Sequence, residues 1–227
     1  MKPSLRRPAA GPREPCRIHP LGDAALLIEI GSRVDTALNS RALALAAALG
    51  RRPDVREAVA GYASVTVHYD PDTVDMESLE DAIRRRMARP RGTPGRERLH
   101  RIPVVYDGPD LEEAAAALGI GAGEIVRLHS APIYRVFMLG FVPGFAYLGP
   151  LPPELRLPRR SVPRTAVPAG SVGVAGAQTA VYPFASPGGW HLIGRTHLRL
   201  FLPDSDPPTL LHPGDRVRFT PLAREPA

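Results

Sequence analysis

The chain loses its helical periodicity after about residue 140, and this change constrains the fold more than any other feature. The stretches that follow are short and alternating, namely SVGVAG (171–176), HLRLFL (197–202) and DRVRF (215–219). Proline and glycine turns separate them. Short strands at such spacing are typical of a β-barrel or a β-sandwich. The second half of the chain is therefore predicted to be mainly β.

The first ninety residues have a different pattern, typical of a small α+β domain. DAALLIEI (23–30) and SVTVHYD (64–70) are predicted strands. Asp35 is placed to cap a helix that ends at Gly50. A second helix is expected from Asp75, with apolar residues on one face and most of the Arg84–Arg86 run outside. The predicted order is strand–helix–strand–helix.

A stretch rich in Pro, Gly and Arg, ARPRGTPGRER (88–98), separates the two patterns and is predicted to be a linker. We therefore expect an α+β domain over residues 17–88 and a mainly β domain over residues 98–221. After the linker, HRIPVVYD (100–107) and YRVFML (134–139) are predicted strands.

Two short helices are predicted between these strands. Asp110 and Glu113 form a capping-box-like start for the first, which ends at Gly119. The second is expected around residues 124–129.

Composition excludes several classes of function. The net charge of +6 comes from arginines scattered through the chain, without a basic stripe interleaved with aromatics, so nucleic acid is not an expected partner. Lys2 is the only lysine, which removes P-loop, Schiff-base and biotinyl-lysine chemistry. No apolar run is long enough to span a membrane. Cys16 is the only cysteine, so internal disulfides are impossible and a cytoplasmic location is expected.

Three weak motifs are rejected as sites. GIGAGE (119–124) breaks the dinucleotide-binding pattern at its last position. Ser171 lacks the spacing and the following helix of a nucleophile elbow. His191 and His197 have no cysteine nearby and no carboxylate between them, so no metal site is predicted.

Four segments within 57 residues together suggest a ligand site: 140–149, 158–173, 175–183 and 186–196. Prolines fix their backbone, glycines expose N–H groups to a ligand, and arginines suit carboxylate or phosphate. The candidate catalytic residues are Arg164, Arg195 and Gln178. The candidate substrate- or nucleotide-binding residues are Phe141, Pro143, Gly144, Tyr147, Thr179, Tyr182, Ser186, Gly188, Gly189, Trp190 and His191.

These segments also carry a family resemblance. GFVPGFAYLGPLP (140–152), VPAGSVGVAGAQTAVYP (167–183) and SPGGWHLIGRT (186–196) resemble the KipI/PxpB family, also called allophanate hydrolase subunit 1-like proteins. Flanking segments extend the resemblance over roughly residues 18–220. Pro150 and Ala180 stand where the family usually has glycine, which affects local turn geometry.

The resemblance implies a fold and an activity. The fold would be a small N-terminal α+β domain followed by a cyclophilin-like β-barrel. The activity would be that of the PxpB-type component of an ATP-dependent 5-oxoprolinase, which opens 5-oxo-L-proline to L-glutamate together with a KipA/PxpC-type subunit and a LamB/YcsF-type PxpA subunit. ATP with Mg²⁺ would be bound jointly with these partners.

Two alternatives stay open at this point. One is a KipI-type inhibitor of a sensor histidine kinase, and the other is a carboxyltransferase-type subunit of a urea carboxylase/allophanate hydrolase system. The segment GFVPGFAYLG (140–149) is expected to be a rigid lip of either the substrate site or the subunit interface.

Overall fold

The computed structural model describes residues 16–88 and 97–223, which belong to two compact units divided between Gly92 and Thr93. The predicted N-terminal tail, and the predicted linker except for its two ends, lie outside these residues. Among the residues that are described, no helix has the length and apolar character needed to cross a membrane.

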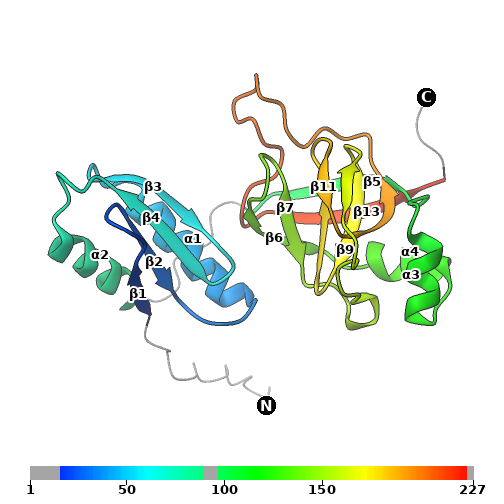
Figure 1. Ribbon diagram of the computed structural model, residues 1–227, viewed down its shortest axis with the longest axis horizontal. Helices are drawn as coiled ribbons and strands as arrows, with labels where there is room; N and C mark the ends of the chain where they lie inside the picture. Colours follow the sequence, from blue (N-terminus) through cyan, green and yellow to red (C-terminus); the bar gives the residue numbers. More distant parts are fainter. Residues whose placement is uncertain (1–15, 89–96, 224–227) are drawn as a thin grey trace, which may run out of the picture. The chain divides into compact units, whose positions relative to one another are not determined.

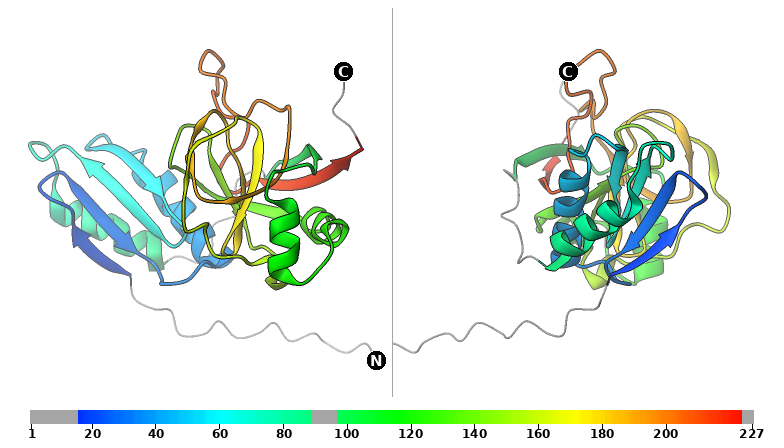
Figure 2. Two further views of the ribbon diagram at one scale, coloured as in Figure 1. Left: turned by 45° about the vertical axis from the view of Figure 1, so that its right-hand side comes forward. Right: turned by 90° about the vertical axis from the view of Figure 1, so that its left-hand side faces the viewer.

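Unit 1 is a four-stranded antiparallel sheet with two helices on one face (Figure 2). In the strand order β1-β2-β4-β3, the central strands β2 and β4 pair with each other, although α1 and β3 separate them in the chain. The core lies between the sheet and the helices and includes Ile28, Leu45, Val67 and Ile83. Its elements are β1 (Arg17–Pro20), β2 (Ala25–Glu29), α1 (Thr36–Leu49), β3 (Val55–Ala60), β4 (Ser64–Tyr69) and α2 (Met76–Ala88).

Local sequence signals explain both ends of α1. The Asp35 carboxylate accepts hydrogen bonds from the backbone N–H groups of Ala37 and Leu38, at 2.8 and 2.9 Å. This confirms the predicted cap. Gly50 follows the last turn with ordinary right-handed backbone, so the helix ends there without the left-handed conformation that glycine often supplies. Sequence analysis missed β1 and β3, and the observed order is β-β-α-β-β-α.

Unit 2 is built around a closed seven-stranded barrel with the order β10-β7-β6-β13-β5-β12-β9 (Figure 1). The pairing of β13 with β5 is parallel, and the other pairs are antiparallel. The predicted α+β class and the barrel are therefore confirmed. The barrel strands are β5 (Leu99–Val105), β6 (Tyr134–Leu139), β7 (Ala146–Gly149), β9 (Ser171–Ala175), β10 (Gln178–Val181), β12 (His191–Arg195) and β13 (Arg216–Leu222).

Helices and a small ribbon complete unit 2. The helices α3 and α4 pack on the barrel through Leu111, Ala114 and Ile125. Gly119 ends α3 at φ +68°, as its position in the sequence predicts. The remaining elements are α3 (Leu111–Leu118), α4 (Ala122–Ser130), the 3₁₀ turn η1 (Pro153–Leu155), and the two-stranded ribbon of β8 (Arg164–Val167) and β11 (Ser186–Gly188).

Two predictions for this unit were wrong. The alternating segment 197–202 is not a strand and makes one isolated bridge, Phe201 to Thr209. The barrel closes without this segment, so it finds no strand edge to extend. The segment 140–149 is also not a loop throughout, because its last four residues form β7.

A polar chain crosses the interior of the barrel unit at the fully buried His129. The Thr179 hydroxyl donates to the Gly173 carbonyl (3.0 Å), so it accepts the Nε2 proton of His129 (2.8 Å). The other ring nitrogen, Nδ1, then accepts from the Tyr106 hydroxyl (2.7 Å). Burial lowers the pKa of His129 from 6.5 to about 3, so the folded protein keeps this imidazole neutral.

We expect this histidine to make the stability of unit 2 depend on pH. Unfolding returns the pKa of His129 to its ordinary value, so the unfolded chain binds a proton below about pH 6.5 that the folded chain excludes down to about pH 3. As the pH is lowered from about 6.5 toward 3, the free energy of unfolding should fall by up to about 1.4 kcal/mol per pH unit. Urea denaturation at several pH values would measure it.

His129→Gln should weaken that pH dependence, whatever it costs in absolute stability. His68→Gln, at an exposed position of β4, is the matched control and should leave the slope unchanged. An unchanged slope in His129→Gln would show that another group carries the acid sensitivity.

Candidate functional site

The turn 106–110 between β5 and α3 lies against β12 and organises the site. Its middle residue, Gly108, approaches the backbone of residues 192–194 so closely that a Cβ would overlap Leu192 and Gly194. The backbone N–H of Asp110 donates to the Leu192 carbonyl (3.0 Å), which ties the turn to the strand. The two acidic residues of this turn bind arginines from later segments of the chain. Asp107 binds one arginine and Asp110 binds two.

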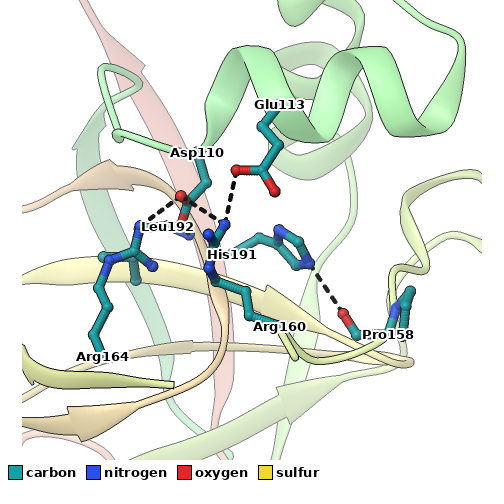
Figure 3. A network of polar contacts seen from close by, with 7 residues as sticks. All are labelled: Asp110, Glu113, Pro158, Arg160, Arg164, His191 and Leu192. Carbon is teal, nitrogen blue, oxygen red and sulfur yellow. Dashed lines mark hydrogen bonds and ion pairs between the residues drawn. The ribbon is translucent and has the colours of Figure 1, made fainter. Parts of the chain in front are cut away.

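The buried Asp110 is the centre of a polar network (Figure 3). One carboxylate oxygen accepts from Arg164 Nη2 (2.6 Å) and Arg160 Nη1 (3.0 Å). The other accepts from the backbone N–H of Leu192 (2.7 Å). Glu113, on the first turn of α3, binds the same Nη1 of Arg160 at 2.8 Å. One carboxylate thus joins the start of α3, the segment before β8, β8 itself and β12.

Asp110 is the N-cap residue of α3, as predicted, but the expected capping hydrogen bond was wrong, because its side chain makes no hydrogen bond to the first turn of α3. Burial favours the neutral acid and would raise its pKa. The hydrogen bonds from Arg164 and Leu192 and the charges of Arg164 and Arg160 outweigh burial, so the pKa lies below its ordinary value. Asp110 is therefore a carboxylate at neutral pH, and attraction between charges competes successfully with the local cap.

Three buried polar atoms around this network have no hydrogen-bond partner within the described ranges. They are Arg164 Nη1, Ser186 Oγ and His191 Nδ1. They belong to β8, β11 and β12, and Arg164 pairs with Gly188 across the β8–β11 ribbon. His191 Nε2 donates to the Pro158 carbonyl (3.0 Å), which leaves Nδ1 as a lone-pair acceptor (Figure 3). Buried atoms without partners are costly, so this arrangement favours a bound group or an ordered water.

An aromatic cluster joins the three segments that carry the family resemblance, 140–152, 167–183 and 186–196. The Phe145 ring lies edge-on to four other rings. The distances between ring centroids are 5.0 Å to Tyr147, 5.3 Å to Tyr182, 5.4 Å to Phe141 and 5.6 Å to Trp190. Tyr182 and Trp190 are almost completely buried, and half-buried Tyr147 packs against the cluster. Packing takes up most of the surface of Phe145, Tyr182 and Trp190, so these side chains are structural, whereas the Phe141 ring is mostly exposed.

The two tyrosine hydroxyls of this cluster lie near positive charge. Burial raises the pKa of Tyr182, although a hydrogen bond with the backbone of Trp190 and the charges of Arg159 and Arg164 act in the opposite direction. Burial likewise raises the pKa of Tyr147 against the charge of Arg159. Both phenols therefore stay protonated and can donate hydrogen bonds. We use the name arginine–tyrosine cluster for these two phenols, Arg159, whose charge acts on both, and Arg164, whose charge acts on Tyr182. Such donors suit a carboxylate or a phosphoryl group.

Other candidate residues lie in different surroundings. Arg195 forms an exposed ion pair with Asp107, at 3.0 Å. Thr179 is fully buried in the barrel interior, where it binds His129. Gln178, half-buried, begins β10. Three glycines shape the surroundings. Gly144 has φ +77°, Gly188 lies against the Tyr182 ring, and the carbonyl of Gly189 accepts from Arg160 N.

Sequence analysis missed three acidic residues of the site: Asp107, Asp110 and Glu113. They come from the β5–α3 region, about fifty or more residues before the arginines that they bind. The signal that could have found Asp107 and Asp110 is the pair of aspartates flanking a Gly-Pro turn, three positions apart. Within residues 16–88 and 97–223, no three His, Cys, Asp or Glu side chains are grouped so as to hold a metal ion.

Gly108→Ala tests whether the close approach of this turn to β12 holds the site together. Its Cβ would force backbone apart rather than a flexible side chain, so we expect a loss of about 1–3 kcal/mol in unfolding free energy. Gly123→Ala is the matched control, since a Cβ there meets nothing within 4 Å and α4 should gain helix propensity. Thermal melts of both variants give the comparison, and equal melting temperatures would contradict the role of the turn.

The chain matches known proteins over most of its length. The family model described as "Carboxyltransferase domain, subdomain C and D" matches residues 16–211. The B-type subunit of 5-oxoprolinase from Escherichia coli O157:H7 is 44% identical over 209 residues, which cover 90% of this chain and 95% of that protein. The corresponding 5-oxoprolinase protein of Bacillus subtilis (strain 168) is 39% identical over 225 residues, or 92% and 94% of the two chains.

A solved structure carries the same fold within a longer chain. The crystal structure of TTHA0988 matches with a TM-score of 0.80 and 42% identity over 89% of this chain. The match spans only 40% of the TTHA0988 chain, so more than half of that protein lies outside it. The chain belongs to the carboxyltransferase subdomain C and D family and, within it, to the KipI/PxpB family of 5-oxoprolinase proteins.

Proposed function

We propose that this chain is the PxpB-type component of an ATP-dependent 5-oxoprolinase complex that converts 5-oxo-L-proline to L-glutamate. The observation that carries the proposal is the 44% identity, over nearly the full length of both chains, to a protein named as the B-type subunit of 5-oxoprolinase. The expected partners are a KipA/PxpC-type subunit and a LamB/YcsF-type PxpA subunit. Membership of a carboxyltransferase family keeps a role in a urea carboxylase system as the second candidate.

The chemistry of the reaction fits the groups at the arginine–tyrosine cluster. A lactam is an unreactive amide, so its oxygen must be activated before water can attack the carbonyl carbon. ATP would transfer its terminal phosphoryl group to that oxygen. A first water would then add to the activated carbon, and the C–N bond would break to give an acyl phosphate with a free amine. A second water would hydrolyse the acyl phosphate to L-glutamate and phosphate. Negative charge on the transferred group needs fixed donors, and arginines with protonated phenols supply them.

Arg164 is the residue that we propose for direct contact with the substrate carboxylate or the phosphoryl group. Asp110 binds its Nη2, which fixes the plane of the guanidinium. Its Nη1 finds no partner in the described part of the chain, so one donor remains for a ligand. Arg195 is the second proposed contact. Its side chain is about half exposed beside Asp107.

We propose that the site is completed by a partner subunit. The relatives are named as one type of subunit of an enzyme, and the same fold is less than half of the TTHA0988 chain. Mg²⁺ bound to ATP would take its ligands from the phosphates, water and the partners, because the described residues offer no grouped set of acidic and histidine ligands.

The purified single chain should therefore show negligible 5-oxoproline-dependent ATP hydrolysis. Co-expression with the two partner subunits should restore it, and ADP release would measure both. Robust turnover by the single chain would contradict a shared site. Turnover that depends on urea instead of 5-oxoproline would favour the second candidate.

Arg164→Lys should lower turnover of the assembled complex by about 100-fold or more. Lysine keeps one charged nitrogen for Asp110 but has no second terminal nitrogen for a ligand, so stability should change little. Arg127→Lys, in an exposed pair with Glu124, is the matched control. Turnover within about twofold of the wild type in Arg164→Lys would make this arginine structural.

Arg195→Ala should lower turnover to a similar extent. The loss of its exposed ion pair with Asp107 should cost at most about 1 kcal/mol of stability. The measurement is turnover per assembled complex together with the melting temperature. If the variant assembles poorly but the assembled fraction turns over as fast as the wild type, Arg195 lies outside the catalytic machinery.

A further inference from the structure

Phe141 combines two unfavourable features on the surface of unit 2. Its side chain is 58% exposed, and its backbone has φ +71°, the left-handed region. It is the only non-glycine residue with positive φ in the described ranges. A bulky residue in this region is strained, and an exposed aromatic ring gains little from burial to offset the strain. The folding of the chain alone therefore gives no reason for phenylalanine at this position.

The surrounding turn holds Phe141 rigidly. Gly140 N donates to the Phe145 carbonyl and Phe145 N donates to the Val142 carbonyl, each at 3.1 Å, which closes the turn. The Phe141 ring stands edge-on to the buried Phe145 ring at 5.4 Å. Because these bonds already order the backbone of the turn, a partner that buries the ring does not lose backbone conformational entropy there.

The turn that carries Phe141 packs on the segment 200–210, which has apolar side chains of its own. A Cβ on Gly144 would lie 2.7 Å from Phe201 Cβ, so the turn packs directly on that residue. The Phe201 ring lies 6.3 Å from the half-buried Phe184 ring, and the neighbouring Leu202 is 40% exposed. We call this region the Phe141 surface; its residues are Phe141, Pro143, Phe184, Phe201 and Leu202.

We infer that the Phe141 surface is the docking site for the KipA/PxpC-type subunit, an inference that rests on the proposed function. Rigid aromatic anchors in an apolar patch are typical of the residues that dominate protein–protein affinity. The TTHA0988 chain, 42% identical over the shared part, continues for more than half of its length beyond that part. A chain that joins this fold to a further region in one polypeptide favours a partner equivalent to that region, and under the proposed function we take this partner to be the KipA/PxpC-type subunit.

The position of the surface agrees with a shared active site. Phe141 contacts Phe145, which contacts Tyr147 and Tyr182, whose hydroxyls belong to the arginine–tyrosine cluster. A partner seated on Phe141 would therefore lie one aromatic layer from the donors proposed to bind the substrate. This assigns the segment 140–145 to the interface and leaves the cluster behind it to the ligand.

The test separates the ring of Phe141 from its backbone. Phe141→Asn and Phe141→Gly both remove the ring, and both residues tolerate the left-handed backbone. Phe141→Tyr keeps an aromatic ring at the same position. Calorimetric titration of each full-length variant with the purified KipA/PxpC-type subunit gives its affinity, and a thermal melt gives its stability. Ile133→Asn is the matched control, since Ile133 is 42% exposed and directly precedes β6, whereas the Phe141 turn follows β6.

We expect the Asn and Gly variants to weaken binding about tenfold or more with little change in melting temperature, while Phe141→Tyr and Ile133→Asn bind as the wild type does. Wild-type affinity in Phe141→Asn and Phe141→Gly would overturn the docking site and leave the proposed function intact. If the wild type itself does not bind this partner, both the docking site and the proposed partner are wrong.

Discussion

The contact of the turn 106–110 with β12 is the constraint on which the rest of unit 2 depends. The missing side chain at Gly108 lets the turn lie against the strand, which brings the Asp110 carboxylate within 2.7 Å of Leu192 N. Asp110 can then reach Arg164, and Asp107 can reach Arg195. The Tyr106 hydroxyl, at the start of the same turn, reaches the buried His129. One short segment thus fixes the barrel interior and the two proposed catalytic arginines.

Local patterns predicted the elements that local interactions determine. Asp35 caps α1 and Gly119 ends α3, because both act within one helical turn. Short strands between turns predicted a barrel or a sandwich, and the family resemblance selected the barrel. Asp110 shows where this reasoning fails. Its sequence neighbours suggest a helix cap, but arginines at least fifty residues away compete more strongly for the carboxylate. The segment 197–202 fails for a related reason, since its alternation suits a strand but the closed barrel offers no edge.

The candidate site was predictable as a set of segments but not as a set of roles. The segments of Phe141, Tyr182 and Trp190 do meet around Phe145, as their shared glycine, proline and aromatic content suggested. Whether an aromatic residue is buried or exposed depends on tertiary packing, which separates Phe141 at the surface from Trp190 in the core. Burial also decides which donors lack partners, and sequence carries no signal for that.

In the proposed site, Asp110 acts through Arg164. A double-mutant cycle with Asp110→Asn and Arg164→Lys, measured as turnover of the assembled complex, tests it most directly. If Asp110 positions the guanidinium, the two losses should not multiply, and the double variant should turn over about as slowly as the slower single variant. Losses that multiply would show that the two residues act independently and would contradict the account.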